Sequence, residues 1–281
     1  MTCNELTVRA HEMSLAVKTW GDPGNPAIIA LHGWQDNAGT FDRLASLLPD
    51  FYWIVPDLPG HGKSEHRGKG AEYTLWAYCP EVMALADAMS LDTFILVGHS
   101  MGGGIANLLA GLYPERISKL ILLDIIGVVT SALEDTVMHM RAAVQQRVEQ
   151  PLRKAGLYSS LELAIAARAK RGITAEAASL LAARGVKQGD DGYFWGHDQR
   201  LILKRTLSLN EEQMALFLQA IDCPVLVIAS REAVVREAVI QKRVALVKNI
   251  QMEKLSGGHH QHLDGDVGAI ATLMGSFLAQ K

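Results

Sequence analysis

The sequence contains few cysteines, and these form no recognisable pattern. Its 281 residues include three of them, Cys3, Cys79 and Cys223, which are widely scattered. Because the cysteines are odd in number and scattered, they predict neither a disulfide framework nor a zinc-type ligand motif. They favour a reducing compartment. The N-terminus also lacks a basic segment followed by an apolar one, so we expect no signal peptide. A cytoplasmic protein is the resulting expectation.

An excess of basic charge and long apolar runs are also missing. The net charge of −3 predicts no nucleic-acid partner and no polybasic membrane surface. No apolar run approaches the roughly 20 residues that span a bilayer, so we expect no membrane span. Hydrophobic residues make up 49% and charged residues 20% of the chain, as in ordinary globular enzymes. The length allows one large domain with an insert, and nothing indicates the oligomeric state.

Short apolar runs alternate with helical patterns in both the first and the last part of the chain. Residues 5–20 alternate polar and apolar positions, which predicts one or two antiparallel strands. The continuous apolar runs predict buried strands at 27–31, 52–55, 94–97, 120–123, 225–228 and 250–255. Predicted helices separate most of them, which indicates the α/β class with a mainly parallel sheet.

The middle of the chain has a different pattern. Between about residues 131 and 218 there is no buried strand run, and 133–150, 160–171 and 174–184 have helical composition. We therefore predict a core made of residues 1–128 and 219–281, with a helical cap, residues 129–218, inserted in it. An aromatic patch at 193–195 could line a pocket, but packing between cap and core is the favoured interpretation.

One motif carries most of the functional information. The predicted strand 94–97 leads into Gly98-His99-Ser100-Met101-Gly102, and a helical run follows it. Strand, Gly-x-Ser-x-Gly and helix form a nucleophile elbow, in which a strained turn lifts the serine hydroxyl clear of the sheet. Ser100 is therefore the predicted nucleophile. The Met101 N–H points into the same space and is a predicted oxyanion donor.

The predicted base lies in a loop rich in glycine and histidine that follows the last predicted strand. His259 comes directly after two glycines, where the loop can lean over the serine. His260 and His262 are interpreted as packing or hydrogen-bonding partners. Together with Asp264 these histidines could also bind a metal, but their spacing is not that of a zinc helix motif and a serine nucleophile needs no metal. We therefore expect no metal at this loop.

Two carboxylates compete for the role of the acid that orients the base. Asp124 ends the strand that follows the elbow helix, and Glu232 follows the strand 225–228. An aspartate at a strand end can also cap the next segment, and a loop glutamate can simply be solvated. Asp124 is slightly favoured. For the second oxyanion donor we predict the N–H of Trp34 in the loop after strand 27–31, while the His32 side chain is expected to hold backbone carbonyls there.

These residues resemble the α/β-hydrolase superfamily along nearly the whole chain. The resemblance rests on the elbow and on three segments: 32–34, 57–64 and the Gly258-His259 loop. Within it, the run 120–124, the 197–201 segment and the histidine-rich ending are similar to serine hydrolase-like proteins. The resemblance implies an eight-stranded core, a helical cap, a serine nucleophile and no cofactor. It also places the acid either after the sixth strand, where Asp124 stands, or after the seventh, where this chain has Glu232 in place of the usual aspartate.

A serine at the elbow, in place of the aspartate of epoxide hydrolases and dehalogenases, predicts acyl transfer through an acyl-enzyme. The expected activity is a carboxylesterase acting on a small-molecule acyl substrate of small or medium size. A lactonase or carbon–carbon bond hydrolase using the same serine is the first alternative. A ligand-binding protein on a hydrolase fold that has lost catalysis is the second. The residues that bind the substrate are not predicted.

Overall fold

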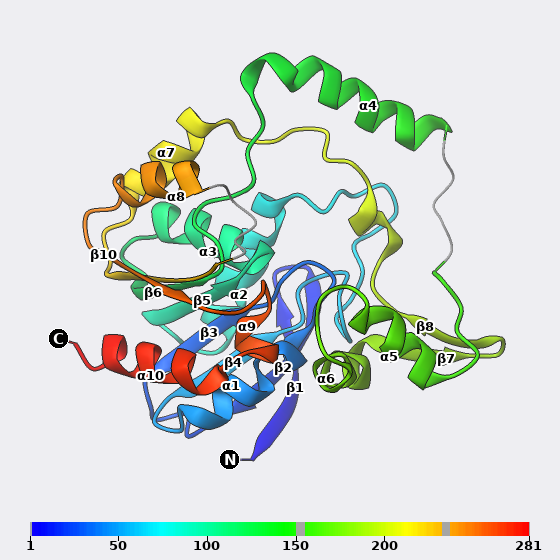
Figure 1. Ribbon diagram of the computed structural model, residues 1–281, viewed down its shortest axis with the longest axis horizontal. Coiled ribbons are helices and arrows are strands. Elements are labelled where there is room, and N and C mark those ends of the chain that lie inside the picture. Colours follow the sequence, from blue (N-terminus) through cyan, green and yellow to red (C-terminus); the bar gives the residue numbers. More distant parts are fainter. Residues whose placement is uncertain (1, 150–154, 232–236, 281) are drawn as a thin grey trace.

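The computed structural model of the protein describes residues 2–149, 155–231 and 237–280. Its centre is an eight-stranded sheet with the order β1-β2-β4-β3-β5-β6-β9-β10 (Figure 1). The pairs β1–β2 and β2–β4 are antiparallel and all the others are parallel. The strands are β1 (Cys3–Ala10), β2 (Met13–Trp20), β3 (Ala27–Leu31), β4 (Tyr52–Pro56), β5 (Phe94–His99), β6 (Ile117–Leu123), β9 (Val225–Ser230) and β10 (Ile250–Leu255). The predicted fold class is confirmed.

Burial explains why the strands have these sequences. Every residue of β4, β5 and β9 is buried, because helices cover both faces of the sheet, and continuous apolar runs result. β2 instead alternates buried and half-buried residues, as expected for a strand with one well-covered face. β1, at the edge, is mostly exposed.

Helices pack on both faces of the sheet. One face carries α2 (Cys79–Ala88), α3 (Met101–Leu112), α7 (Glu211–Ala220) and α8 (Glu237–Val244), and the other carries α1 (Asp42–Leu47) and α10 (Val267–Leu278). Two apolar clusters fill these layers, one on each side. The short helices are α9 (Gln261–Asp264), η1 (Ala38–Phe41), η2 (Leu75–Tyr78), η3 (Leu133–Asp135) and η4 (Gln199–Ile202).

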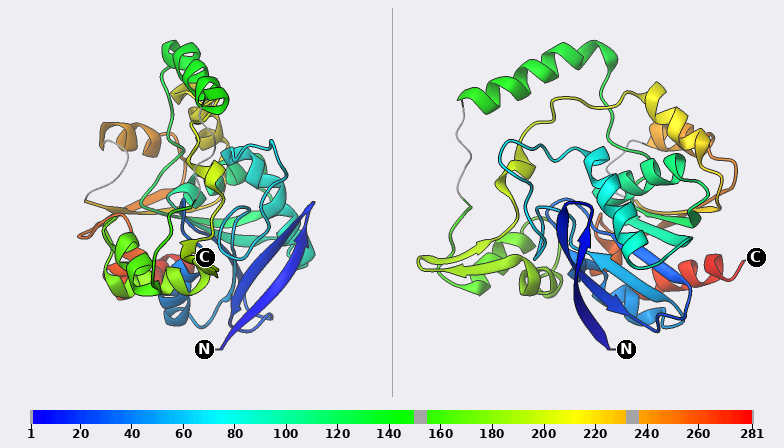
Figure 2. Two further views of the ribbon diagram at one scale, coloured as in Figure 1. Left: turned by 90° about the vertical axis from the view of Figure 1, so that its right-hand side faces the viewer. Right: turned by 180° about the vertical axis from the view of Figure 1, so that it is seen from behind.

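The predicted cap contains α4 (Thr136–Glu149), α5 (Leu161–Ala169) and α6 (Ala175–Gly185). It also contains a β-hairpin that the sequence patterns did not predict, β7 (Val186–Gly189) and β8 (Gly192–Trp195). Figure 2 shows α4 standing away from the sheet in both views. The predicted boundary at residue 218 falls inside α7, which packs against α3. Among the described helices none is long and apolar enough to cross a membrane.

Parallel strands bring distant residues to one edge of the sheet. Ser100 follows β5, Asp124 follows β6, Trp34 lies in the loop after β3, and His259 lies in the loop after β10. In an open α/β sheet, ligands bind at the carboxyl ends of the strands. The topology therefore gathers the predicted site residues at the place where the fold class accepts ligands.

Candidate active site

Ser100 occupies a strained turn between β5 and α3. Its backbone has φ 49° and ψ −113°, in a region that residues with a side chain rarely adopt. Such a conformation costs about 1–3 kcal/mol and persists only where the surroundings enforce it. Here the Ser100 N–H donates to Leu123 O (3.2 Å) and Ser100 O accepts from Gly104 N (2.9 Å), which fixes both ends of the turn. The local geometry is that of the predicted nucleophile elbow.

The two glycines of the motif are required by close packing. A Cβ atom on Gly98 would lie 2.5 Å from Gly102 O, because the first turn of α3 crosses over the end of β5. A Cβ atom on Gly102 would lie 2.1 Å from Leu31 O, because the same turn packs against the end of β3. Distances under 3 Å force backbone shifts, so any larger residue would push the elbow out of position.

The predicted base contacts one of the two candidate acids. His259 Nδ1 lies 2.5 Å from Asp124 Oδ2, across 135 residues of sequence. The Asp124 side chain is fully buried, whereas that of His259 is about one quarter exposed. The other carboxylate oxygen of Asp124 accepts from Ser230 N at 2.7 Å, so both oxygens have partners. Asp124 itself has a positive φ of 55°, as Ser100 does. The rival acid, Glu232, lies outside the described residues.

His259 is tied to the residue beside the serine. His99 Nε2 donates to the His259 carbonyl oxygen at 2.9 Å, and the two rings lie 4.8 Å apart between centroids. Within the described part of the chain, no hydrogen bond joins Ser100 Oγ to the His259 ring. Catalytic hydrogen bonds often tighten only when substrate binds. The structure thus places the predicted acid against the predicted base, and His99, the neighbour of Ser100, holds that base from behind.

Both predicted oxyanion donors lie in residues that share a cavity with Ser100: Met101 follows it directly in sequence, and Trp34 lies in the loop after β3. Met101 begins α3, where the first N–H groups have no helical acceptor and the helix dipole is positive. Neither the Met101 N–H nor the Trp34 N–H donates to another described residue. The His32 ring holds the loop from behind: Nδ1 donates to Gly33 O (2.8 Å) and Nε2 accepts from Leu58 N (2.9 Å). Burial lowers the pKa of His32, so this ring stays neutral.

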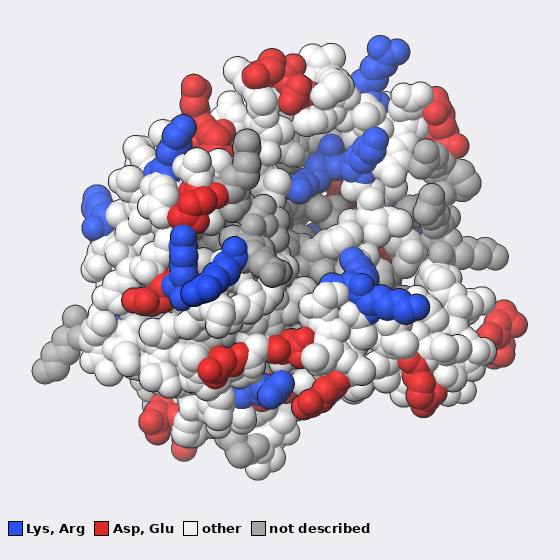
Figure 3. Space-filling model, viewed as in Figure 1, with Lys and Arg blue, Asp and Glu red and all other residues white. Residues whose placement is uncertain are grey.

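A cavity of about 670 Å³ opens above Ser100 between the core and the cap. This volume is in the range of small-molecule sites. Trp34 and Met101 line it as well, together with apolar residues that include Leu75, Ile125 and Val128. The face shown in Figure 3 is hollowed beneath α4, and Lys and Arg side chains border the hollow.

None of the residues of the aromatic patch, 193–195, is among the described residues that line this cavity. Trp195 packs instead against a small apolar cluster around α6 that includes Ala178 and Leu181. Its indole N–H donates to Ala164 O of α5 at 3.3 Å. These contacts support the interpretation of the patch as packing.

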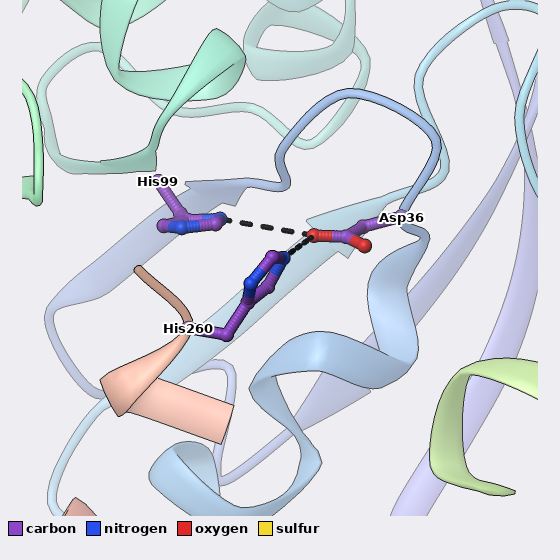
Figure 4. A group of neighbouring side chains, drawn as sticks. All are labelled: Asp36, His99 and His260. Atoms are coloured by element: carbon purple, nitrogen blue, oxygen red, sulfur yellow. Dashed lines mark hydrogen bonds and ion pairs between the residues drawn. The ribbon is translucent and has the colours of Figure 1, made fainter. Parts of the chain in front are cut away.

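A second polar cluster lies beside the site and was not predicted. Asp36, His99 and His260 place one oxygen and two ring nitrogens within 4.8 Å of one another (Figure 4). Such donors suit a divalent metal. However, Arg168 of α5 lies 2.6 Å from Asp36 Oδ1 and 3.4 Å from His260 Nε2. A guanidinium at this position repels a second cation, so we interpret the cluster as an ion-pair network that fastens the cap to the core.

The charges of this cluster follow from burial and hydrogen bonding. Burial by itself would raise the pKa of Asp36, but His260 at 3.2 Å and the charges of His260 and Arg168 hold the pKa well below its usual value. Burial lowers the pKa of His99 well below its ordinary value, and the neighbouring histidines lower it further. His262, which hydrogen bonds with Thr40 Oγ1 at 2.8 Å, has a pKa lowered to about 3, mainly by burial.

A second buried ion pair fastens α6. Arg184 Nε donates to Asp57 Oδ2 at 2.7 Å, and its Nη1 lies 2.8 Å from Glu5 on β1. The sequence offers little sign of this pair or of Asp36–Arg168. Each joins residues more than 120 positions apart, and arginines in an amphipathic helix usually face solvent. An aspartate soon after a strand end, as at 36 and 57, is the one local feature that could have drawn attention.

Comparison with known proteins agrees with this geometry. The family model described as alpha/beta hydrolase fold matches residues 26–266. A serine hydrolase-like protein of Danio rerio is 28% identical over 274 residues, covering 93% of this chain and 84% of the relative. A second, from Dictyostelium discoideum, is 31% identical over 271 residues, covering 90% and 75%.

A solved structure supports the same relationship. A hypothetical protein of Pseudomonas aeruginosa PAO1 superimposes with a TM-score of 0.93 and 35% sequence identity. The match covers 98% of this chain and 99% of the other. The relationship therefore extends over the predicted cap as well as the predicted core.

Proposed function

Because the chain belongs to the α/β-hydrolase family and is similar to serine hydrolase-like proteins, we propose that it is a carboxylesterase for small or medium acyl esters. Ser100 is the nucleophile, His259 the general base and acid, and Asp124 the residue that orients His259. The amides of Trp34 and Met101 form the oxyanion hole.

The contact between Asp124 and His259 is the observation that carries this proposal. A carboxylate 2.5 Å from Nδ1 keeps the proton on that nitrogen, which leaves Nε2 free to accept the serine proton. The buried Asp124 side chain and its bond from Ser230 N hold the carboxylate in place. The same arrangement stabilises the imidazolium that forms during the reaction.

The reaction follows from these positions. Ser100 Oγ attacks the carbonyl carbon and gives its proton to His259 Nε2, and the tetrahedral oxyanion accepts hydrogen bonds from the two amides. The C–O bond to the alcohol then breaks, and His259 returns the proton to the leaving oxygen. Water, deprotonated by His259, hydrolyses the acyl-enzyme and releases the acid. The strained backbone of Ser100 keeps its hydroxyl exposed for each attack.

A fluorophosphonate probe tests the proposal directly. Ser100 Oγ should displace fluoride from phosphorus, and mass spectrometry of the digested protein should locate the adduct at Ser100. Ser100→Ala should abolish labelling and lower ester hydrolysis by about 10⁴-fold or more, while Ser256→Ala, in the exposed loop before His259, should change neither. A folded protein that does not label at Ser100 would be a binding protein and would refute the proposal.

The ester class is tested separately from the nucleophile. A panel of p-nitrophenyl esters, lactones and vinylogous diketones should show the highest kcat/KM for esters. If labelling at Ser100 occurs but lactones or diketones are cleaved faster, the serine mechanism stands and the carboxylesterase assignment fails.

A further inference from the structure

The cavity above Ser100 has an excess of positive charge. The described residues that line it include four cations, Arg147, Arg200, Lys204 and Arg205, but a single carboxylate, Glu72. A cavity lined by one sign of charge concentrates substrates of the opposite sign. This excess is notable because the chain as a whole carries a net charge of −3.

Two of these four cations are already neutralised. Arg200 Nη2 lies 2.6 Å from Asp198 Oδ2, and that carboxylate also accepts from Tyr73 Oη. Arg147 Nη2 lies 3.3 Å from Glu72 Oε1. Within the described chain Lys204 and Arg205 form no ion pair, and Arg205 donates only to the carbonyl oxygen of Val129, at 3.3 Å. The uncompensated charge at the cavity therefore belongs to two consecutive residues.

The backbone that carries these two side chains is held on both sides. Lys204 N donates to Gln146 Oε1 (2.8 Å), and Lys204 O accepts from Arg147 Nη1 (2.9 Å), both from α4. Thr206 Oγ1 donates to Glu72 Oε2 at 2.8 Å. The backbone of the two cations is thus held in place, whereas their charged groups are exposed. Fixing the backbone lowers the entropy that a bound anion must overcome.

We propose that Lys204 and Arg205 bind an anionic group, a carboxylate or a phosphate, on the acyl substrate of Ser100. This inference rests on the proposed function and specifies its substrate class. The apolar part of the substrate lies against Leu75, Ile125 and Val128, and the anion lies at the cap side of the same cavity. Arginine and lysine together suit either anion, because both present N–H donors that carry full charge.

Two pairs of matched substrates test the proposal and locate the anion. p-Nitrophenyl hemiglutarate and p-nitrophenyl valerate differ in a carboxylate at the end of the acyl chain. S-Butanoyl-4′-phosphopantetheine and S-butanoylpantetheine differ in a phosphate on the leaving group. In at least one pair we expect the anionic member to have the higher kcat/KM. The pair in which the anionic member is preferred then shows whether the anion belongs to the acyl group or to the leaving group.

The double variant Lys204→Gln/Arg205→Gln should reduce that preference on the order of tenfold, the usual effect of losing one charged hydrogen bond. The control Arg141→Gln/Lys170→Gln removes the same charge from exposed cap positions that do not line the cavity, and it should leave the preference unchanged. The preference of the wild type should also shrink at 0.5 M salt. Thermal unfolding of both variants checks that they are folded.

The outcomes separate this inference from the proposed function. If neutral esters are cleaved and anionic members are not preferred, or if the control reduces the preference equally, the anion site is refuted and the esterase proposal stands. If Ser100 neither labels nor supports hydrolysis of any substrate, the proposed function fails first.

Discussion

The cavity has two sides that are built differently. On the elbow side, Ser100, Asp124 and His259 extend from a buried sheet, and the backbone at Ser100 and Asp124 has positive φ. On the opposite side, α4 is held mainly by Gln146 and Arg147, and of its described residues Ala143 alone is buried. Burial and hydrogen bonds fix the residues on the elbow side, whereas α4 has few such contacts.

This difference predicts which substitutions should affect stability or activity. Substituting a residue in a buried network lowers the stability or the activity of the protein, because the surrounding side chains cannot rearrange to compensate. Exposed residues such as Val137 and Val148, each about 80% exposed, have few contacts to lose. We therefore expect substitutions on the α4 side to change specificity without disturbing the chemistry proposed for the elbow side. Substitutions of matched type on both sides test this contrast.

The largest effect is expected for Asp124→Asn. Asparagine tolerates the positive φ, so the fold should persist, but it favours the wrong tautomer of His259. We expect kcat for ester hydrolysis to fall on the order of 10³- to 10⁴-fold. Asp135→Asn, beside α4, should have no measurable effect. Glu232→Gln should also leave kcat nearly unchanged, and a larger loss there than for Asp124→Asn would assign the acid to Glu232.

The second largest effect is expected on the free energy of unfolding, when the ion pair between the cap and Asp36 is removed. Arg168→Met should lower the free energy of unfolding by about 3 kcal/mol, because the buried Asp36 loses the guanidinium that lies 2.6 Å from its Oδ1. Arg141→Met, on the exposed surface of α4, should change it by less than about 0.5 kcal/mol. Urea unfolding at pH 7 measures both. Equal losses in the two variants would show that the network does not fasten the cap.

Acid should destabilise the elbow side more than the α4 side. In the folded protein His262 stays neutral, because its pKa is about 3, whereas the unfolded ring gains a proton below its ordinary pKa of 6.5. Stability is therefore lost as the pH falls from 7 to 5. For His262→Gln this loss should be smaller by about 2 kcal/mol, measured by urea unfolding at both pH values. His139→Gln, exposed on α4, should keep the full loss.

The smallest effect is expected for the exposed apolar residues of α4. Val137→Ser and Val148→Ser should each change the unfolding free energy by no more than about 0.5 kcal/mol. The kcat for a neutral p-nitrophenyl ester should also be unchanged. A loss of several kcal/mol in either variant would mean that this surface is covered in solution by another chain, which size-exclusion chromatography would detect.

The core was predictable because its signals are local. Buried strands such as β9 appear as apolar runs, and the elbow appears as two glycines around Ser100, since each reflects packing within a few residues. The hairpin β7–β8 was missed, because its four-residue strands are only partly buried and their pattern is weak. The predicted turn at 189–192 coincides with its tip.

The sequence by itself determined the fold class and pointed to Ser100, His259 and the two amides proposed to bind the oxyanion, because strand ends and glycine spacing are written into short stretches. Only the tertiary structure placed Asp124 against His259, Asp36 against Arg168, and Lys204 and Arg205 at the cavity of Ser100. These contacts join residues far apart in the chain. A charged side chain has the same appearance in sequence whether it faces solvent or a buried partner, and folding decides which of the two it meets.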